Sequence, residues 1–153
     1  MVGDSLFDHD LFKIVYCSRA TKLPSSTELH ALLIQARNFN SANGITGILL
    51  YKDGSYLQYI EGEQEVINQL YTSIKRDQRH CNVKTLVSGK IEQRVFHNWH
   101  MGFYEPSLNS IKISDDENSN PLHDLDKKVF ESASPNFDIT SVHQIIGTFL
   151  KYA

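Results

Sequence analysis

Two strand-like segments joined by a tight turn constrain the fold of this 153-residue chain more than any other feature. Residues 45–51 and 55–61 are rich in apolar and aromatic side chains, and Lys52, Asp53 and Gly54 separate them. An Asp-Gly pair at such a junction is a strong hairpin signal, because glycine readily adopts the positive φ angles that tight hairpin turns require. The two segments are therefore predicted to pair as antiparallel strands.

An amphipathic helix is predicted on each side of this hairpin. Before the hairpin, Ser25 and Glu28 form a capping-box pattern and Gly44 provides a stop, so a helix should extend over about 26–42. After the hairpin, apolar residues at helical spacing predict a second helix over about 66–76.

Three further segments have the composition of strands. They are residues 11–17 before the first helix, and 83–87 and 99–104 after the second. The resulting order is that of an α+β fold, a ferredoxin-like βαββαββ sandwich. In that topology the strand over 11–17 is a central neighbour of the strand over 55–61.

The sheet is expected to need a second covering layer, because both faces of its strands are rather apolar and two helices cover one face. Residues 121–133 and 138–152 show helical apolar spacing, after an acidic loop over 114–120. We expect them to form two helices packed on the back of the sheet. The predicted organisation is a tail over 1–10, one folded domain over 11–106, and a loop with a helical cap over 107–153.

Three polar residues occupy positions where the pattern places buried apolar side chains. Asn40 continues the apolar stripe of the first helix, and Tyr16 and Gln58 lie at core-facing positions of neighbouring strands. A buried polar group without a partner costs about 1–3 kcal/mol, so the three residues are predicted to line a site for a polar ligand. Two charged residues are interpreted differently: Arg37 as a solvated arginine on the helix surface, and Asp77 as a turn former outside the site.

Charge and composition argue against several function classes. The net charge is −3 and the basic residues are scattered, so direct nucleic-acid binding is not expected. The N-terminus lacks the pattern of a secretory signal and the chain lacks the ~18 consecutive apolar residues of a membrane span, which predicts a cytoplasmic protein with no membrane contact. His80, His97 and His100 lack the spacing of metal ligands, and no metal site is predicted.

Several sequence motifs follow one another in a fixed order between about residues 11 and 106. They are VYCSRA, ARNFNSANGITGILLY, GSYLQYIEGEQEVINQLY, IKRDQRH and VFHNWHMGFYEP. Together they resemble the BLUF family, which are blue-light sensors that use flavin adenine dinucleotide (FAD). The combination of NxxxGITG with QYIEG and RH is the most specific part of the resemblance. One departure is Tyr56, which stands where a phenylalanine is common in the family.

The resemblance implies that FAD binds between the two helices, on the sheet face that carries Tyr16. Asn40 and Gln58 would form hydrogen bonds with the flavin ring. Arg79 and His80 match family positions near the polar edge of the ring and the start of the ribityl chain.

The resemblance also implies a mechanism without covalent chemistry. Light would make the flavin an oxidant, Tyr16 would give it an electron and a proton, and the hydrogen bonds of Gln58 would be rearranged when the charges recombine. Trp99 and Met101 would then carry the change to the C-terminal helices. No enzyme motif is evident in the remaining residues, so we expect output through a light-dependent downstream effector protein or through changed self-association of a homo-oligomer.

Two other classes of function remain open from the sequence. A ferredoxin-like enzyme such as an acylphosphatase would place an arginine near the end of the first strand. Arg19 is there, but no glycine-rich phosphate-binding loop accompanies it. A ligand-binding or interaction module without photochemistry would keep the fold and tolerate Gln58→Leu with little loss of response.

Overall fold

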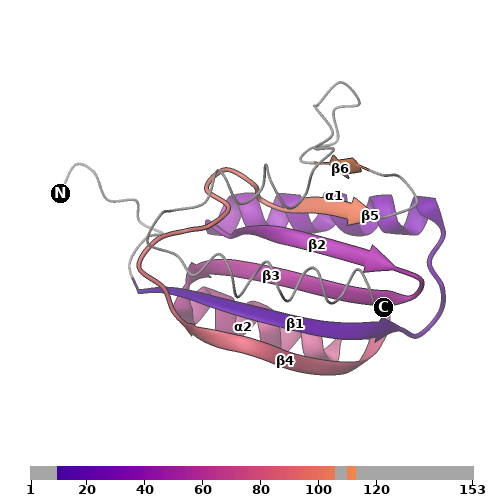
Figure 1. Cartoon of the computed structure of the whole chain (residues 1–153), viewed down its shortest axis with the longest axis horizontal. Helices are drawn as coiled ribbons and strands as arrows, with labels where there is room; N and C mark the ends of the chain where they lie inside the picture. The colour runs from indigo at the N-terminus through magenta and orange to yellow at the C-terminus, as the bar shows by residue number, and fades with distance from the viewer. Residues whose placement is uncertain (1–9, 106–109, 113–153) are drawn as a thin grey trace.

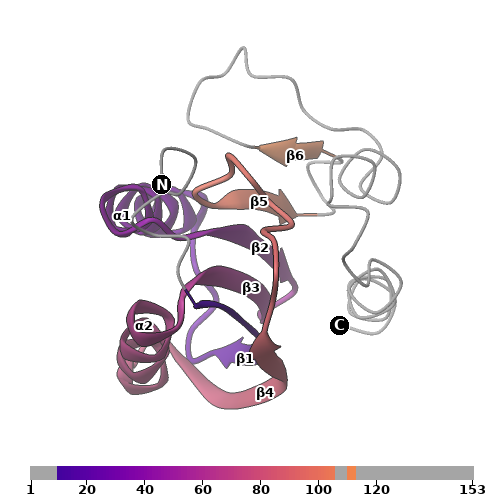
Figure 2. The ribbon, with the colours of Figure 1, turned by 90° about the vertical axis from the view of Figure 1, so that its left-hand side faces the viewer.

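A mixed sheet with two helices on one face forms the part of the protein that the computed structural model describes, residues 10–105 and 110–112. In chain order the elements are β1 (Leu11–Ala20), α1 (Ser26–Asn43), β2 (Thr46–Lys52), β3 (Ser55–Glu63), α2 (Gln64–Arg76), β4 (His80–Lys90), β5 (Gly102–Glu105) and β6 (Ser110–Lys112) (Figure 1). The strand order across the sheet is β4-β1-β3-β2-β5-β6, and Figure 2 shows α1 and α2 on the same side. The α+β fold is therefore as predicted.

The central hairpin forms as its turn residues predict. β2 and β3 pair antiparallel, and both Asp53 and Gly54 adopt positive φ angles, 49° and 85°, in the turn between them. β1 lies antiparallel to β3 on the other side, with Tyr16 directly opposite Gln58. The prediction that the first and third strands are central neighbours is confirmed.

Local signals also fix the limits of α1. The Ser25 hydroxyl accepts the backbone N–H of Glu28 at 3.1 Å, and the Glu28 carboxylate accepts the backbone N–H of Ser25 at 2.9 Å. At the other end Gly44 adopts the left-handed conformation, with φ 66°, and its N–H donates to the Asn40 carbonyl. The predicted capping box and glycine stop are both confirmed.

The core lies between the sheet and the two helices. Side chains of β3 alternate, so that Tyr56, Gln58 and Ile60 face this core, and the intervening residues face the other side of the sheet. The core cluster contains Ile14, Tyr16, Leu29, Leu33, Ile45, Leu49, Tyr51, Tyr56, Ile60, Ile67, Tyr71, Met101 and Phe103. No helix in the described part of the chain is long and apolar enough to cross a membrane.

The strand predicted over 99–104 begins three residues later, at Gly102. Trp99 instead belongs to a turn, in which its N–H donates to the Phe96 carbonyl at 3.3 Å. The indole ring of Trp99 stacks on Phe96, with ring centroids 5.6 Å apart, whereas Met101 and Phe103 belong to the core cluster. The prediction that Trp99, Met101 and Phe103 share one strand face is therefore wrong.

The strand predicted over 83–87 is longer in the structure, because β4 extends over 11 residues. Its pairing with β1 shifts register between Val15 and Tyr16 and again between Cys17 and Arg19. Such irregularities disturb the alternation of polar and apolar residues, which explains why the sequence pattern underestimated this strand. Apart from Asp10 and β6, the predicted tail and C-terminal cap lie outside the described residues.

The capping box yields a test of the fold. Replacing Ser25 by alanine removes the acceptor for the Glu28 N–H, and we expect a loss of about 1 kcal/mol in the free energy of unfolding. Urea unfolding followed by circular dichroism measures this change. The neighbouring Ser26→Ala variant, at an exposed position inside the helix, serves as the control and should change stability much less. Equal effects of the two variants would contradict the assignment of the cap.

Candidate functional site

A buried hydrogen-bonded chain joins three side chains on the helix-covered face of the sheet. The Tyr16 hydroxyl donates to Gln58 Oε1, and Gln58 Nε2 donates to Met101 Sδ at 3.4 Å. Tyr16 is 4% exposed, Gln58 8% and Met101 0%. The pairing of β1 with β3 places the first two opposite each other, and the segment before β5 supplies the third. The structure thus brings together three of the four residues predicted to form the switch.

The surroundings of Tyr16 keep its hydroxyl protonated. Burial is the main cause that raises its pKa well above the ordinary value of a tyrosine, and the neighbouring Tyr71 adds to the effect. The rings of Tyr16 and Tyr71 lie 5.3 Å apart and are tilted by 42°. Tyr71 in turn forms a hydrogen bond with Thr85 at 2.6 Å, which links α2 to β4. Tyr16 is therefore a hydrogen-bond donor to Gln58.

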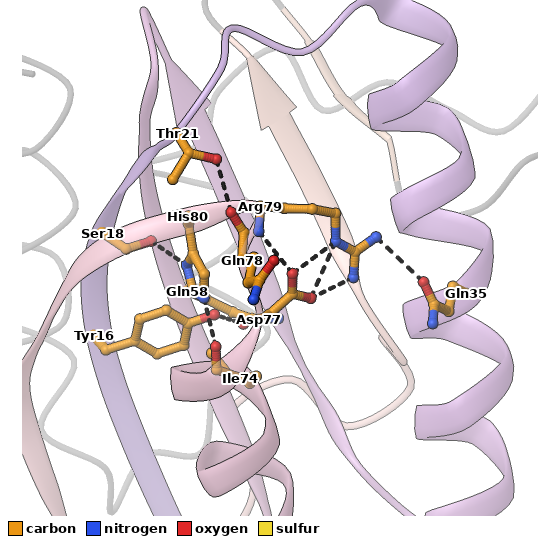
Figure 3. Close-up of polar contacts among 10 residues, drawn as sticks. All are labelled: Tyr16, Ser18, Thr21, Gln35, Gln58, Ile74, Asp77, Gln78, Arg79 and His80. Atoms are coloured by element: carbon orange, nitrogen blue, oxygen red, sulfur yellow. Dashed lines mark hydrogen bonds and ion pairs between the residues drawn. The ribbon is translucent and has the colours of Figure 1, made fainter.

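His80 connects three elements beside this chain (Figure 3). Its Nε2 lies 2.5 Å from the carbonyl oxygen of Ile74, and its Nδ1 lies 2.7 Å from the Ser18 hydroxyl. A carbonyl only accepts, so Nε2 carries the proton, and in the neutral ring Nδ1 accepts from Ser18. The ring edge of His80 also approaches Tyr16, at 6.3 Å between centroids. His80 therefore lies beside Tyr16.

Arg79 reaches from the turn after α2 toward α1. Its guanidinium pairs with Asp77, at 2.5 Å between Nη2 and Oδ2, and Nη1 donates to Gln35 of α1 at 3.4 Å (Figure 3). Asp77 also accepts the backbone N–H of Arg79 at 2.9 Å, which confirms its role as a turn former. The hydrogen bonds from Arg79 lower the pKa of the Asp77 carboxyl. An exposed cation is thereby oriented between the C-terminal end of α2 and the middle of α1.

Asn40 and Arg37 connect α1 to the residues just before β5. Asn40 is 2% exposed, and its Nδ2 donates to the His100 carbonyl at 2.6 Å. Arg37 Nε donates to the Met101 carbonyl at 2.9 Å. The interpretation of Arg37 as a solvated arginine is therefore wrong, because a backbone acceptor distant in sequence orients its half-buried side chain.

Hydrogen bonds within the protein already satisfy the buried polar groups from which a ligand was predicted. Within the described residues, every buried side-chain nitrogen or oxygen has a hydrogen-bond partner in the protein. Tyr16 and Gln58 satisfy each other, and Asn40 uses a backbone carbonyl. Burial of these groups alone therefore does not demand a ligand. The Gln58 amide nevertheless has one donor, Nε2, and one acceptor, Oε1, between two different neighbours, Met101 and Tyr16. These two groups of the amide can exchange positions.

Ser18 and Tyr71 also lie beside the site, although the sequence pattern did not single them out. Ser18 lies two residues after Tyr16 and hence on the same face of β1, so strand periodicity could have found it. Tyr71 lies on the apolar stripe of α2, where it resembled an ordinary core residue. No group of three His, Cys, Asp or Glu side chains that could hold a metal ion occurs in the part of the chain that the structure describes.

Comparison with known proteins gives one consistent result. A family model described as sensors of blue light using FAD (BLUF) matches residues 11–102. The photoactivated adenylate cyclase subunit beta of Euglena gracilis is 34% identical over 89 residues, which are 58% of this chain and 10% of that protein. The homologous protein from Euglena longa is 35% identical over the same length. The chain therefore spans about a tenth of the length of these curated relatives.

Several solved structures share this fold over much of the chain. The photo-activated state of BlsA is 36% identical, with a TM-score of 0.59 over 62% of this chain and 69% of that one. The dark state of the BLUF protein BlrB is 29% identical, with a TM-score of 0.62 over 66% and 76%. Klebsiella pneumoniae BlrP1 with FMN and cyclic diGMP matches in fold, at 24% identity and a TM-score of 0.73, over 93% of this chain and 35% of that one.

The buried tyrosines yield a test of the site. Burial is the main cause that raises the pKa of Tyr56 to about 12, and it raises the pKa of Tyr16 and Tyr59 further. The ordinary pKa of tyrosine is 10.0, so the three protonated hydroxyls favour the folded state below pH 10. Their contribution to the free energy of unfolding is lost as the pH rises through the pKa values of the folded protein. An absorbance titration of tyrosinate should therefore show at most four of the seven tyrosines ionised at about pH 11.

Full denaturation at the same pH should ionise the remaining three tyrosines, and circular dichroism reports whether the fold is intact at each pH. Reversible ionisation of five or more tyrosines in the folded protein would contradict the burial of these side chains.

Proposed function

The chain belongs to the BLUF family of blue-light sensors using FAD, and from that premise we propose that it binds FAD and converts light into a rearrangement of the Tyr16–Gln58–Met101 chain. As a member of this family, the chain is a flavin-binding sensor of blue light. The observation that carries the finer proposal is the buried hydrogen bond from the Tyr16 hydroxyl to Gln58 Oε1. The register of β1 and β3 holds these two side chains face to face.

The residues present fit a flavin in chemistry and in position. A flavin ring presents hydrogen-bond acceptors and one N–H donor along its polar edge, and the amides of Asn40 and Gln58 each offer both a donor and an acceptor. Gln58 lies in β3 on the face of the sheet that α1 and α2 cover, and Asn40 is a buried residue of α1. Arg79 and His80 would hold the polar edge and the start of the ribityl chain, where Arg79 adds a positive charge.

When bound, the flavin supplies the absorption of blue light and, once excited, the oxidising power. Tyr16 would be the residue that gives an electron and its hydroxyl proton to the excited flavin, because burial keeps it a neutral phenol and Gln58 Oε1 accepts the hydrogen bond of that proton. Return of both to Tyr16 would leave the Gln58 amide with a different set of hydrogen-bond partners. Its Nε2 contact with Met101 Sδ is the bond that links this local change to the rest of the chain.

The signal is proposed to leave through the segment before β5. The side chain of Met101 contacts Gln58, and its carbonyl oxygen accepts from Arg37 of α1, so a new position of Gln58 would change the contact between α1 and the start of β5. Trp99 contributes through its carbonyl, which accepts the Gly47 N–H of β2 at 2.8 Å. We propose a downstream effector protein, or changed self-association of the chain, as the recipient of this change.

The photoswitch is tested with two variants. Tyr16→Phe and Gln58→Leu should each bind flavin but lose the reversible red shift of its absorption after blue illumination, because either change breaks the Tyr16–Gln58 bond. Difference absorption spectra in the dark and after illumination measure this effect. Tyr51→Phe makes the same kind of change at a buried tyrosine of β2 and should keep the shift. A full shift in Gln58→Leu would favour an interaction module without this mechanism.

The cofactor and the role of Arg79 are tested together. Flavin released by heat from the purified protein should be FAD, and chromatography distinguishes it from FMN. If Arg79 holds the ring edge and the ribityl chain, Arg79→Ala should weaken the binding of FAD and of riboflavin by a similar factor, about tenfold for a lost charge-assisted hydrogen bond. Arg76→Ala, at the exposed end of α2, is the matched control. A loss confined to FAD would move Arg79 to the phosphates.

A further inference from the structure

The carboxylate of Glu61 is fully buried on the face of β3 opposite to Gln58. It accepts four hydrogen bonds. Oε1 accepts from the Tyr59 hydroxyl at 3.0 Å and the Val95 N–H at 2.8 Å, and Oε2 accepts from the Thr46 hydroxyl at 2.9 Å and the Phe96 N–H at 2.7 Å. Two of the four donors are therefore successive backbone amides of the connection between β4 and β5.

The donor set fits an ionised carboxylate. Backbone N–H groups only donate, and an ionised carboxylate only accepts, so all four contacts are matched in this state. The two backbone N–H groups can only donate, whereas the Tyr59 and Thr46 hydroxyls can also accept, so a proton on the carboxyl could point only toward a hydroxyl. Burial raises the pKa of the Glu61 carboxyl, and the four hydrogen bonds oppose that rise. Arg94 supplies positive charge nearby, because its Nη1 donates to the Thr46 hydroxyl at 2.9 Å.

The segment that Glu61 holds, residues 94–101, passes from one face of the sheet to the other. At its start the ring of Phe96 packs edge-on against Tyr59, 5.1 Å between centroids, on the same face as Glu61. At its end Met101 lies in the core cluster and contacts Gln58. β3 therefore contacts the same short segment twice, by Glu61 from one face and by Gln58 from the other.

Other bonds tie this segment to the edge of the hairpin. Arg94 Nη2 donates to the Gly44 carbonyl at 2.7 Å, and the Trp99 carbonyl accepts the Gly47 N–H. His100 Nδ1 donates to the Ile45 carbonyl at 2.9 Å. The bonds of Trp99 and His100 fix the later part of the segment beside β2, and Arg94 anchors its start. Between them, the Glu61 carboxylate binds the backbone amides of residues 95 and 96 to β3, and the packing of Phe96 on Tyr59 adds to this contact.

We propose that Glu61 is a positioning residue of the photoreaction: by holding the amides of Val95 and Phe96 it keeps Met101 Sδ against Gln58 Nε2, and so it sets how fast the lit state returns to the dark state. The inference rests on the proposed function of the Tyr16–Gln58 pair. The contact with Met101 is one of the two side-chain hydrogen bonds of Gln58 in the structure, beside the bond with Tyr16. When residues 95 and 96 are released, the Gln58–Met101 contact loses support, and the return of the lit state to the dark state becomes slower.

The test uses the full chain loaded with FAD and the variant Glu61→Gln, which keeps the size of the side chain but replaces one acceptor oxygen by an NH2 group, so that the backbone N–H of Val95 or of Phe96 loses its acceptor. In the dark, hydrogen exchange measured by NMR should show loss of protection at one or both of these amides. After a blue flash, recovery of the dark spectrum should be about threefold slower or more. Glu63→Gln makes the same change two residues along β3, at a partly exposed position, and should alter neither measurement.

A second variant keeps the test valid if Glu61→Gln does not fold. Tyr59→Phe keeps the ring packing on Phe96 and removes one of the four hydrogen bonds, so it should shift both measurements in the same direction by a smaller amount. Recovery that is unchanged or faster despite exposed amides at 95 and 96 overturns the inference, as does unchanged protection of these amides. A wild-type protein without any light-induced shift instead refutes the proposed function, and the inference with it.

Discussion

The antiparallel register between β1 and β3 is the constraint on which the rest of the site depends. It places Tyr16 directly opposite Gln58, with both side chains on the face covered by the helices. Strand side chains alternate between faces, so a slip of one residue would move Tyr16 away from α1 and α2 and leave Val15 or Cys17 in its place. The tight turn at Asp53 and Gly54 fixes the register of β2 with β3, and β1 pairs with the other edge of β3 over almost its whole length. A hydrogen bond between two side chains 42 residues apart thus follows from backbone pairing.

β3 serves two polar networks that share its backbone but not a face. On one face, Gln58 joins Tyr16 to Met101, and on the other, Glu61 collects donors from β2, from β3 itself and from the connection before β5. Both networks end on residues 94–101. Because the interior is closely packed, this segment has few alternative positions, and a displacement at one of its contacts also displaces the other. The sheet is therefore rigid, and β2 and β3 hold residues 94–101 in place.

Local signals in the sequence predicted most of the frame. The capping box at Ser25, the stop at Gly44 and the turn at Asp53 act within a few residues, and each appears in the structure as predicted. Periodicity and topology together also placed Tyr16 beside Gln58. The start of β5 and the length of β4 could not be read in this way, because they depend on partners far away in the sequence and on register shifts that break the alternation. For the same reason the contact of Arg37 with the Met101 carbonyl was missed, since no local pattern identifies a backbone acceptor 64 residues away.

The complete pairing of buried polar groups bears on how a switch can work at this site. Since each buried side-chain polar atom of the described residues has a partner, a flavin edge would share or exchange hydrogen bonds that already exist. Exchanging one hydrogen bond for another changes the free energy by only about 1 kcal/mol, far less than leaving a buried group without a partner. Different arrangements of the Gln58 amide can then lie close in free energy, and a small input decides between them. Met101 suits this role, because a thioether is a weak acceptor whose bond to Nε2 is easily given up. The strong bonds around Glu61 and Asn40 hold the segment, and in the proposed mechanism the weak bond at Met101 is the one that a light-driven change at Gln58 would break.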